Sequence, residues 1–190
     1  LVIFQIGGQP DACLVALDAK SGQERWRALD GKASYSAPRL IRQGNRVVML
    51  AWTGRWLACL EPATGSVLWK VPYKPTKMIL NVADPVLDEA GRKVFLSAFY
   101  DGSVLYALKP DLGTPDLLWK RAGPSERKTD GLHSIIMTPF IRDGHAYGID
   151  SYGEMRCLNL ATGDRVWEDT SLLANGRWAT AHFVQNGDRT

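Results

Sequence analysis

A pattern that occurs four times along the chain constrains its fold more than any other feature of the sequence. Each copy has a small residue followed by leucine, then a short polar stretch with a glycine, and then a tryptophan. The copies are Leu14–Trp26, Leu57–Trp69, Leu105–Trp119 and Arg156–Trp167. Their tryptophans are 43, 50 and 48 residues apart, which fits a four-stranded propeller blade and exceeds the period of ankyrin or tetratricopeptide repeats. The sequence therefore predicts a β-propeller.

The segments around the copies have the composition of strands and turns. Short runs of β-branched and aromatic residues alternate with Gly, Asn, Asp and Pro, which argues against helical repeats. We therefore expect an all-β fold with four-stranded antiparallel blades, the third and fourth strands of each blade lying within the repeated pattern. The expected first strands are 39–41, 86–87 and 140–141, and the expected second strands are 47–52, 94–99 and 146–149.

Both ends of the chain fall inside expected blades. Residues 1–6 have the pattern of a strand, with neither an initiator methionine nor the features of a signal peptide. We expect a single partial propeller over residues 1–190, about four blades' worth of a seven- or eight-bladed wheel. Its expected parts are an incomplete blade at 1–29, whole blades at 30–72, 73–122 and 123–170, and the start of another at 171–190.

The glycine and the tryptophan of each copy have distinct physical roles. The glycine lies where a hairpin turn needs a positive φ, which a residue without a Cβ adopts at no cost. The tryptophan supplies a large apolar face and one N–H that needs a partner when it is buried. The turn glycines are Gly22, Gly65, Gly113 and Gly163, and the tryptophans are Trp26, Trp69, Trp119 and Trp167.

The pattern Ala-Leu-Asp-x-x-(Thr/Ser)-Gly-x-x-x-Trp resembles the PQQ-like (pyrroloquinoline quinone) β-propeller repeat. Quinoprotein dehydrogenases and BamB-like non-catalytic propellers share this repeat, and the chain is closer in character to the second group. The resemblance implies that the four tryptophans dock against the neighbouring blade. It also implies a periplasmic or otherwise extracytoplasmic location. Function follows less directly, because propellers host many unrelated activities.

Composition excludes two classes of partner. The 23 basic and 20 acidic residues are scattered along the chain, whereas a nucleic-acid binder gathers its Lys and Arg on one element. No apolar run approaches the roughly 20 residues that span a bilayer. We therefore expect no nucleic-acid partner and no transmembrane segment.

The candidate catalytic residues do not form a known set. Quinoprotein dehydrogenases of the family carry two adjacent cysteines, whereas Cys13, Cys59 and Cys157 are far apart. Cys59 and Cys157 occupy the small position before the leucine, where a cysteine behaves as a small hydrophobe. The three histidines lack metal-ligand spacing. We expect no catalytic residue, cofactor or metal. The alternative is a dehydrogenase whose PQQ and calcium sites lie largely in other blades.

Long loops on a rigid scaffold are where binding residues concentrate. The loops that follow the fourth strands and those between the second and third strands share one face of a propeller. Two of the longest are basic, and aromatic residues, Trp52 among them, lie beside the turns. These residues indicate a protein or a small acidic ligand as partner, although Lys and Arg also keep loops soluble and the aromatic residues also cap strand ends. The candidate partner face comprises Lys74, Lys77, Arg121, Arg127, Lys128, Tyr100 and Tyr152. The sequence thus favours a non-catalytic interaction or ligand-binding scaffold outside the cytoplasm.

Overall fold

Four antiparallel sheets make up the regular structure of the computed structural model, which describes residues 1–184 and 186 and contains no helix over them. The first sheet has three strands, β1 (Val2–Gln5), β2 (Leu14–Leu17) and β3 (Glu24–Ala28). The second has β4 (Arg39–Gln43), β5 (Arg46–Trp52), β6 (Trp56–Leu60) and β7 (Val67–Pro72). The third has β8 (Val86–Leu87), β9 (Lys93–Ala98), β10 (Gly102–Ala107) and β11 (Asp116–Arg121). The fourth has β12 (Phe140–Arg142), β13 (His145–Ile149), β14 (Met155–Asn159) and β15 (Arg165–Asp169).

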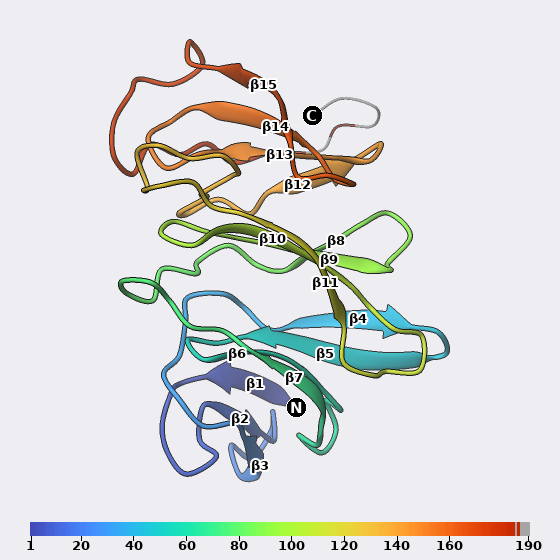
Figure 1. Cartoon of the computed structure of the whole chain (residues 1–190). Helices are drawn as coiled ribbons and strands as arrows, with labels where there is room; N and C mark the ends of the chain where they lie inside the picture. Colours follow the sequence, from blue (N-terminus) through green and yellow to red (C-terminus); the bar gives the residue numbers. More distant parts are fainter. Residues whose placement is uncertain (185, 187–190) are drawn as a thin grey trace.

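Within each sheet the strands pair in sequence order, and the sheets follow one another in chain order from the N-terminus to the C-terminus (Figure 1). The inner strands β8 and β12 of neighbouring sheets contact each other. This arrangement is a partial β-propeller, so the predicted fold class is confirmed. The expected first and second strands coincide with β4, β5, β8, β9, β12 and β13 to within two residues.

Hydrogen bonds join the segments that lead into the first strand of each whole blade, β4, β8 and β12. The backbone N–H of Ala37 donates to Asp84 Oδ1 at 2.7 Å, and the backbone N–H of Asp84 donates to Thr138 Oγ1 at 3.1 Å. Each of these residues directly precedes the proline that opens a blade. The side chain at this position therefore accepts a hydrogen bond from the equivalent backbone position of the preceding blade.

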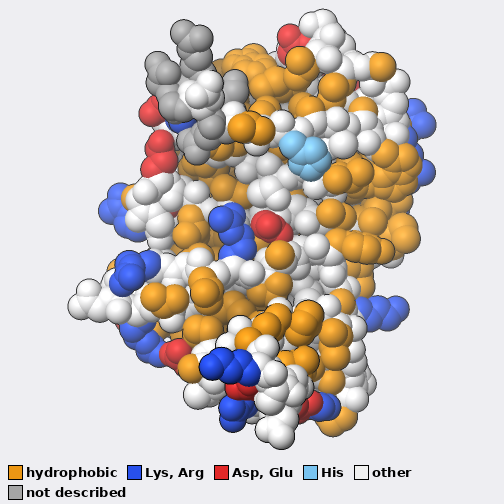
Figure 2. Space-filling model, turned by 180° about the vertical axis from the view of Figure 1, so that it is seen from behind, with side chains coloured by type: hydrophobic (Ala, Val, Ile, Leu, Met, Phe, Trp, Pro, Cys, Tyr) orange, Lys and Arg blue, Asp and Glu red, His pale blue; other side chains and the backbone are white. Residues whose placement is uncertain are grey.

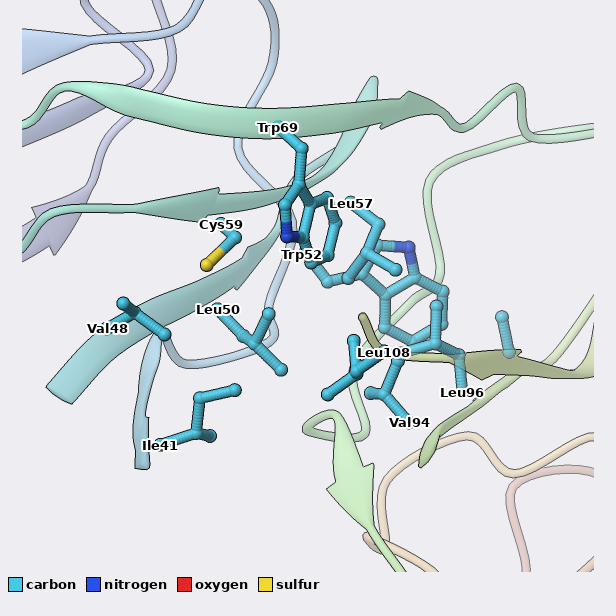
Figure 3. Packing of buried hydrophobic residues seen from close by; sticks show 11 residues of the cluster. Ile41, Val48, Leu50, Trp52, Leu57, Cys59, Trp69, Val94, Leu96 and Leu108 are labelled. Carbon is cyan, nitrogen blue, oxygen red and sulfur yellow. The ribbon is translucent and has the colours of Figure 1, made fainter. Parts of the chain in front are cut away.

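The apolar core lies between the sheets. Figure 3 shows Trp69 of β7 and Leu50 of β5 on the side of the second sheet that faces Val94 and Leu96 of β9. Cys59 belongs to the same cluster and is 1% exposed. It pairs with Trp69 across the strands, as Ala16 pairs with Trp26. A small residue opposite the tryptophan leaves room for the indole ring.

Two tryptophans lie directly on the turn of the following sheet. Trp26 is 8% exposed, and its indole N–H donates to the carbonyl of Pro62 at 3.1 Å. A Cβ added to Gly65, which has a φ of 74°, would lie 2.5 Å from the Trp26 ring. Trp119 repeats this arrangement over Gly163, and its N–H donates to the Leu160 carbonyl at 2.9 Å.

The third copy of the pattern departs from our prediction, because Gly113 does not have a positive φ. Leu112 adopts the left-handed conformation instead, with a φ of 62°, and its N–H donates to the carbonyl of Lys109. In the other copies the glycine N–H reaches back four residues. Two additional residues before Trp119 allow the tighter turn. Leu112 then packs against the cluster that contains Trp69.

The fourth tryptophan is also an exception to the expectation of burial. Trp167 is 40% exposed, and its ring lies 6.1 Å from that of Tyr147 in the same sheet. No strand follows β15 among residues 170–184, so no neighbouring sheet covers the indole ring. These residues belong to the range 171–190, which we predict to begin another blade; residues 185 and 187–190 lie outside the described part of the chain.

Alanine substitutions separate the two kinds of turn glycine. Gly65→Ala places a Cβ against the Trp26 ring at a positive φ, and we expect it to lower the free energy of unfolding by about 3 kcal/mol. Gly113→Ala meets neither obstacle, so we expect a change within about 0.5 kcal/mol. Urea denaturation of both variants measures the difference. Equal losses would show that Gly65 has no special contact with Trp26.

Tryptophan truncations test the contacts between sheets. Trp69→Ala removes a buried indole, and we expect it to cost about 3–5 kcal/mol. Trp167→Ala serves as the matched control, because its side chain is already partly exposed, and we expect it to cost less than half as much. A loss below about 1 kcal/mol for Trp69→Ala would contradict its role between the sheets.

Candidate functional site

Alternate connections of an antiparallel sheet lie at opposite ends of its strands. The β5–β6, β9–β10 and β13–β14 turns therefore share one end with the long loops that follow β7, β11 and β15. We call this end the loop face; it lies to the left in Figure 1, with the tight hairpin turns to the right. The long loops span residues 73–85, 122–139 and 170–184.

Aromatic and charged side chains from these loops contact one another. We refer to this group as the cation–aromatic cluster, and its members come from all three long loops and from the β9–β10 and β13–β14 turns. They are Lys77, Phe99, Tyr100, Glu126, Arg127, Tyr152, Arg177 and Trp178.

Lys77 links the first long loop to the second. Its ammonium group lies 2.9 Å from Glu126 Oε2 and 5.0 Å from the centre of the Tyr100 ring. The hydrogen bond from Lys77 holds the pKa of Glu126 below its ordinary value of 4.5. Exposed ion pairs contribute little individually, but this one joins two loops far apart in sequence.

Arg177 and Trp178 bring the third long loop onto the same group. The Trp178 ring stacks on Phe99, with ring centres 5.1 Å apart and planes at 17°. The Arg177 guanidinium lies 4.6 Å from the centre of the Trp178 ring and donates to the Tyr100 hydroxyl at 2.9 Å. Trp178 has a φ of 75°, a strained conformation for a bulky residue. Such strain persists only where the surroundings hold it.

Arg127 adds a third cation over an aromatic ring. Its guanidinium lies 4.5 Å from the centre of the Tyr152 ring, and that ring lies 6.5 Å from Phe99. Cations at this distance from an aromatic face are attracted by its quadrupole. Because Phe99 and Tyr152 are buried, the cluster offers the rings of Tyr100 and Trp178 together with three cations and one carboxylate. This combination suits an anionic or aromatic partner.

A buried polar network supports the second long loop beneath the cluster. Asp150 forms an ion pair with Arg156 at 2.8 Å, and their side chains are 2% and 6% exposed. Asp150 also accepts from the Thr129 hydroxyl at 2.6 Å and from the His133 backbone N–H at 2.5 Å. Arg156 donates further to Glu168 at 2.7 Å. Because buried charges are costly unless they are paired, this network fixes the loop to the fourth sheet.

The remaining members of the predicted partner face lie apart from this group. Arg121 turns toward the hairpin turn of the next sheet, where its guanidinium lies 2.8 Å from Asp164. Lys74 and Lys128 are exposed, and their side chains make no ion pair within the described residues. Trp52, which we expect beside the turns, is 1% exposed in the core. Lys77, Arg127, Tyr100 and Tyr152 are the predicted residues that the structure brings into the cluster.

Sequence reasoning missed several members of the cluster. Phe99 and Glu126 lie within segments that we interpret as a strand and a basic loop, and neither stands out there. Trp178 lies outside the repeated pattern and directly follows an arginine. That placement is the one feature of the sequence that could have indicated its membership of the cluster. The contact of Arg177 with Tyr100 joins residues 77 positions apart, which no local pattern reveals.

The three cysteines are free and buried. Burial raises the pKa of the Cys59 thiol to about 12, and it raises the pKa values of Cys13 and Cys157 as well. Thiols with raised pKa values are poor nucleophiles and poor metal ligands. Over residues 1–184 and 186, no three His, Cys, Asp or Glu side chains are grouped so that they could hold a metal ion.

The surface carries charges of both signs. On the face shown in Figure 2, Lys and Arg side chains form separate patches with hydrophobic side chains between them. This distribution differs from the continuous basic stripe of a nucleic-acid binder. No helix in the described part of the chain is long and apolar enough to cross a membrane.

The tryptophan–turn contacts and the succession of antiparallel sheets are those of a propeller of the PQQ-like repeat class. The chain belongs to the family described as outer membrane protein assembly factor BamB, whose model matches residues 5–185. This match covers nearly the whole chain.

The sequence identity between the chain and individual relatives is low. The chain is 26% identical to the outer membrane protein assembly factor BamB of Yersinia pestis over 172 residues, and 26% identical to that of Shewanella oneidensis over 165 residues. Each match covers 85% of this chain and 40% of the relative, so the chain spans less than half the length of these relatives. The crystal structure of BamB from Moraxella catarrhalis is 21% identical, covers 86% of this chain and 59% of that chain, and has a TM-score of 0.40.

Titration of Glu126 tests the link between the first two long loops. Its pKa is lowered in the folded state, so the stabilising pair with Lys77 is present above the ordinary pKa and is lost as the pH falls through the lowered one. We expect the carboxyl carbon of Glu126 to titrate below pH 4.5 in an NMR experiment. Lys77→Gln should return the midpoint toward that value, whereas Lys109→Gln, whose partner is Asp116, should leave it unchanged. A midpoint at the ordinary value in the unmodified protein would show that the pair does not form in solution.

Proposed function

We propose that this protein is a non-catalytic scaffold for protein interactions, that it acts outside the cytoplasm, and that it takes part in the assembly of outer membrane proteins. Membership of the family supports the proposal, as does the name of the relatives in Yersinia pestis and Shewanella oneidensis. The partner would bind the loop face, because that is where residues from several blades converge.

The cation–aromatic cluster is the observation that carries this proposal. Aromatic residues and arginine dominate the energetics of protein interfaces, and the cluster combines Tyr100, Trp178 and Arg177 on one exposed surface. Trp178 is 44% exposed, so its ring is accessible to a partner. The buried Asp150–Arg156 pair beneath the cluster holds the second loop in place, which reduces the entropy lost on binding.

The proposal is tested in a bacterium that carries the gene for the full-length protein. Deletion should reduce the amount of folded outer membrane proteins, and the unmodified gene should restore it. The double variant Tyr100→Ser with Arg177→Ser should restore less than half of the lost amount. The matched control, Lys20→Ser with Arg25→Ser on the opposite face, should restore it fully. Unchanged outer membrane protein levels after deletion would contradict the proposal.

We propose further that the protein works without a cofactor. A quinone enzyme needs a stacked site for the quinone, calcium held by oxygen ligands, and a base beside the substrate. The full-length protein should therefore show no saturable binding of pyrroloquinoline quinone in the presence of calcium, and no oxidation of alcohols or sugars. Micromolar affinity together with turnover would favour a quinoprotein dehydrogenase instead.

A further inference from the structure

Two hollows lie on the loop face beside the first and second sheets. One hollow of about 680 Å³ is lined by Lys32, Ala33, Ser34, Tyr35, Gly54, Pro75, Lys77, Met78 and Ile79. A second hollow of about 440 Å³ is lined by Ile6, Gly7, Gly8, Gln9, Gly31, Lys32 and Ala33. Lys32 and Ala33 line both, so the two hollows lie side by side. We call them together the Lys32 groove.

Close packing of glycines shapes the floor of the groove. A Cβ added to Gly54 would lie 2.5 Å from Ile79, and one added to Gly7 would lie 2.8 Å from the backbone nitrogen of Ala33. The Gly54 N–H also donates to the carbonyl of Lys32 at 3.0 Å. These contacts hold the 31–35 segment against the turn of the second sheet, so the groove is a preformed feature of the fold.

Large apolar side chains on the walls of the groove are exposed to solvent. Tyr35, Met78 and Ile6 are 72%, 56% and 60% exposed. Tyr35 and Met78 line the first hollow and Ile6 lines the second; single exposed apolar residues are ordinary, but apolar residues gathered around adjoining hollows mark a binding surface. The three side chains come from three different connections of the chain, so they are brought together by the fold alone.

The charge of the groove has one sign. Lys32 and Lys77 are the charged residues among its lining, and no Asp or Glu lines either hollow. Lys32 is exposed and forms no ion pair within the described residues. Glu126 pairs with Lys77 from outside the groove. A ligand carboxylate would therefore meet complementary charge at Lys32.

We propose that the Lys32 groove binds an extended peptide segment in which apolar side chains alternate with Asp or Glu. An extended segment presents successive side chains on opposite sides, so one set contacts the apolar wall while the other reaches Lys32. The groove adjoins the cation–aromatic cluster, because Lys77 belongs to both. Peptide binding there does not depend on a role in outer membrane assembly, because the observations that support it are the shape and charge of the groove.

Binding is measured by fluorescence anisotropy with the full-length protein. The probe is a fluorescein-labelled, acetylated and amidated peptide of sequence Glu-Phe-Glu-Leu-Glu-Val-Gly. We expect saturable binding that weakens as salt rises, with little binding of the peptide in which lysine replaces every glutamate. Lys32→Glu should raise the Kd about tenfold by reversing a contact charge, and Met78→Ser should raise it about fivefold by removing apolar area.

Two control variants match these changes elsewhere on the surface. Lys20→Glu reverses an exposed lysine in a hairpin turn, and Leu118→Ser removes an apolar side chain that is 46% exposed on β11; both should leave the Kd unchanged. Absence of binding, or equal effects of Lys32→Glu and Lys20→Glu, would overturn the proposal. A dimer that Met78→Ser dissociates in light scattering would assign the groove to a second copy and also overturn it. Loss of peptide binding with intact outer membrane assembly would separate this site from the proposed function.

Discussion

The contact between a tryptophan and the turn of the next sheet is, we infer, the interaction on which the rest of the structure depends. Three features stabilise this contact: a large buried apolar ring, an N–H that donates to a backbone carbonyl, and a glycine whose missing Cβ leaves room for the ring. Trp26 and Trp119 have all three. Trp69 is buried although the corresponding turn has no glycine with a positive φ. Leu112 adopts the left-handed conformation in that turn and packs against the cluster that contains Trp69.

Stacking of the sheets brings distant loops together, and polar contacts then fix them. Along the inner strands, Asp84 accepts from the blade before it and donates to Thr138 of the blade after it. Under the second long loop, the buried Asp150–Arg156 pair is fully partnered. The second long loop is therefore held on the fourth sheet. Glu126 and Arg127, which the second long loop carries, are therefore positioned before any partner of the proposed kind binds, which would favour affinity.

The period of the repeat was sufficient to predict the propeller and its strands, because blade spacing and turn chemistry are local properties of the sequence. Two local predictions failed for physical reasons. Gly113 aligns with the other turn glycines, but two inserted residues move the positive φ to Leu112. Trp167 aligns with the other tryptophans, but its burial depends on a neighbouring sheet. The binding face was predicted only in part, since contacts such as Tyr100 with Arg177 arise from loop paths that no periodicity encodes.

We infer that the proposed partner binds the loop face rather than the face of hairpin turns. Site-specific photo-crosslinking in living cells tests it most directly, with p-benzoylphenylalanine placed at Tyr35 on the loop face or at Ser66 in a hairpin turn, both exposed. The account predicts that the Tyr35 position crosslinks to a protein that mass spectrometry identifies as a component of outer membrane assembly, and that the Ser66 position does not. Crosslinking to that component from Ser66, with none from Tyr35, would contradict it.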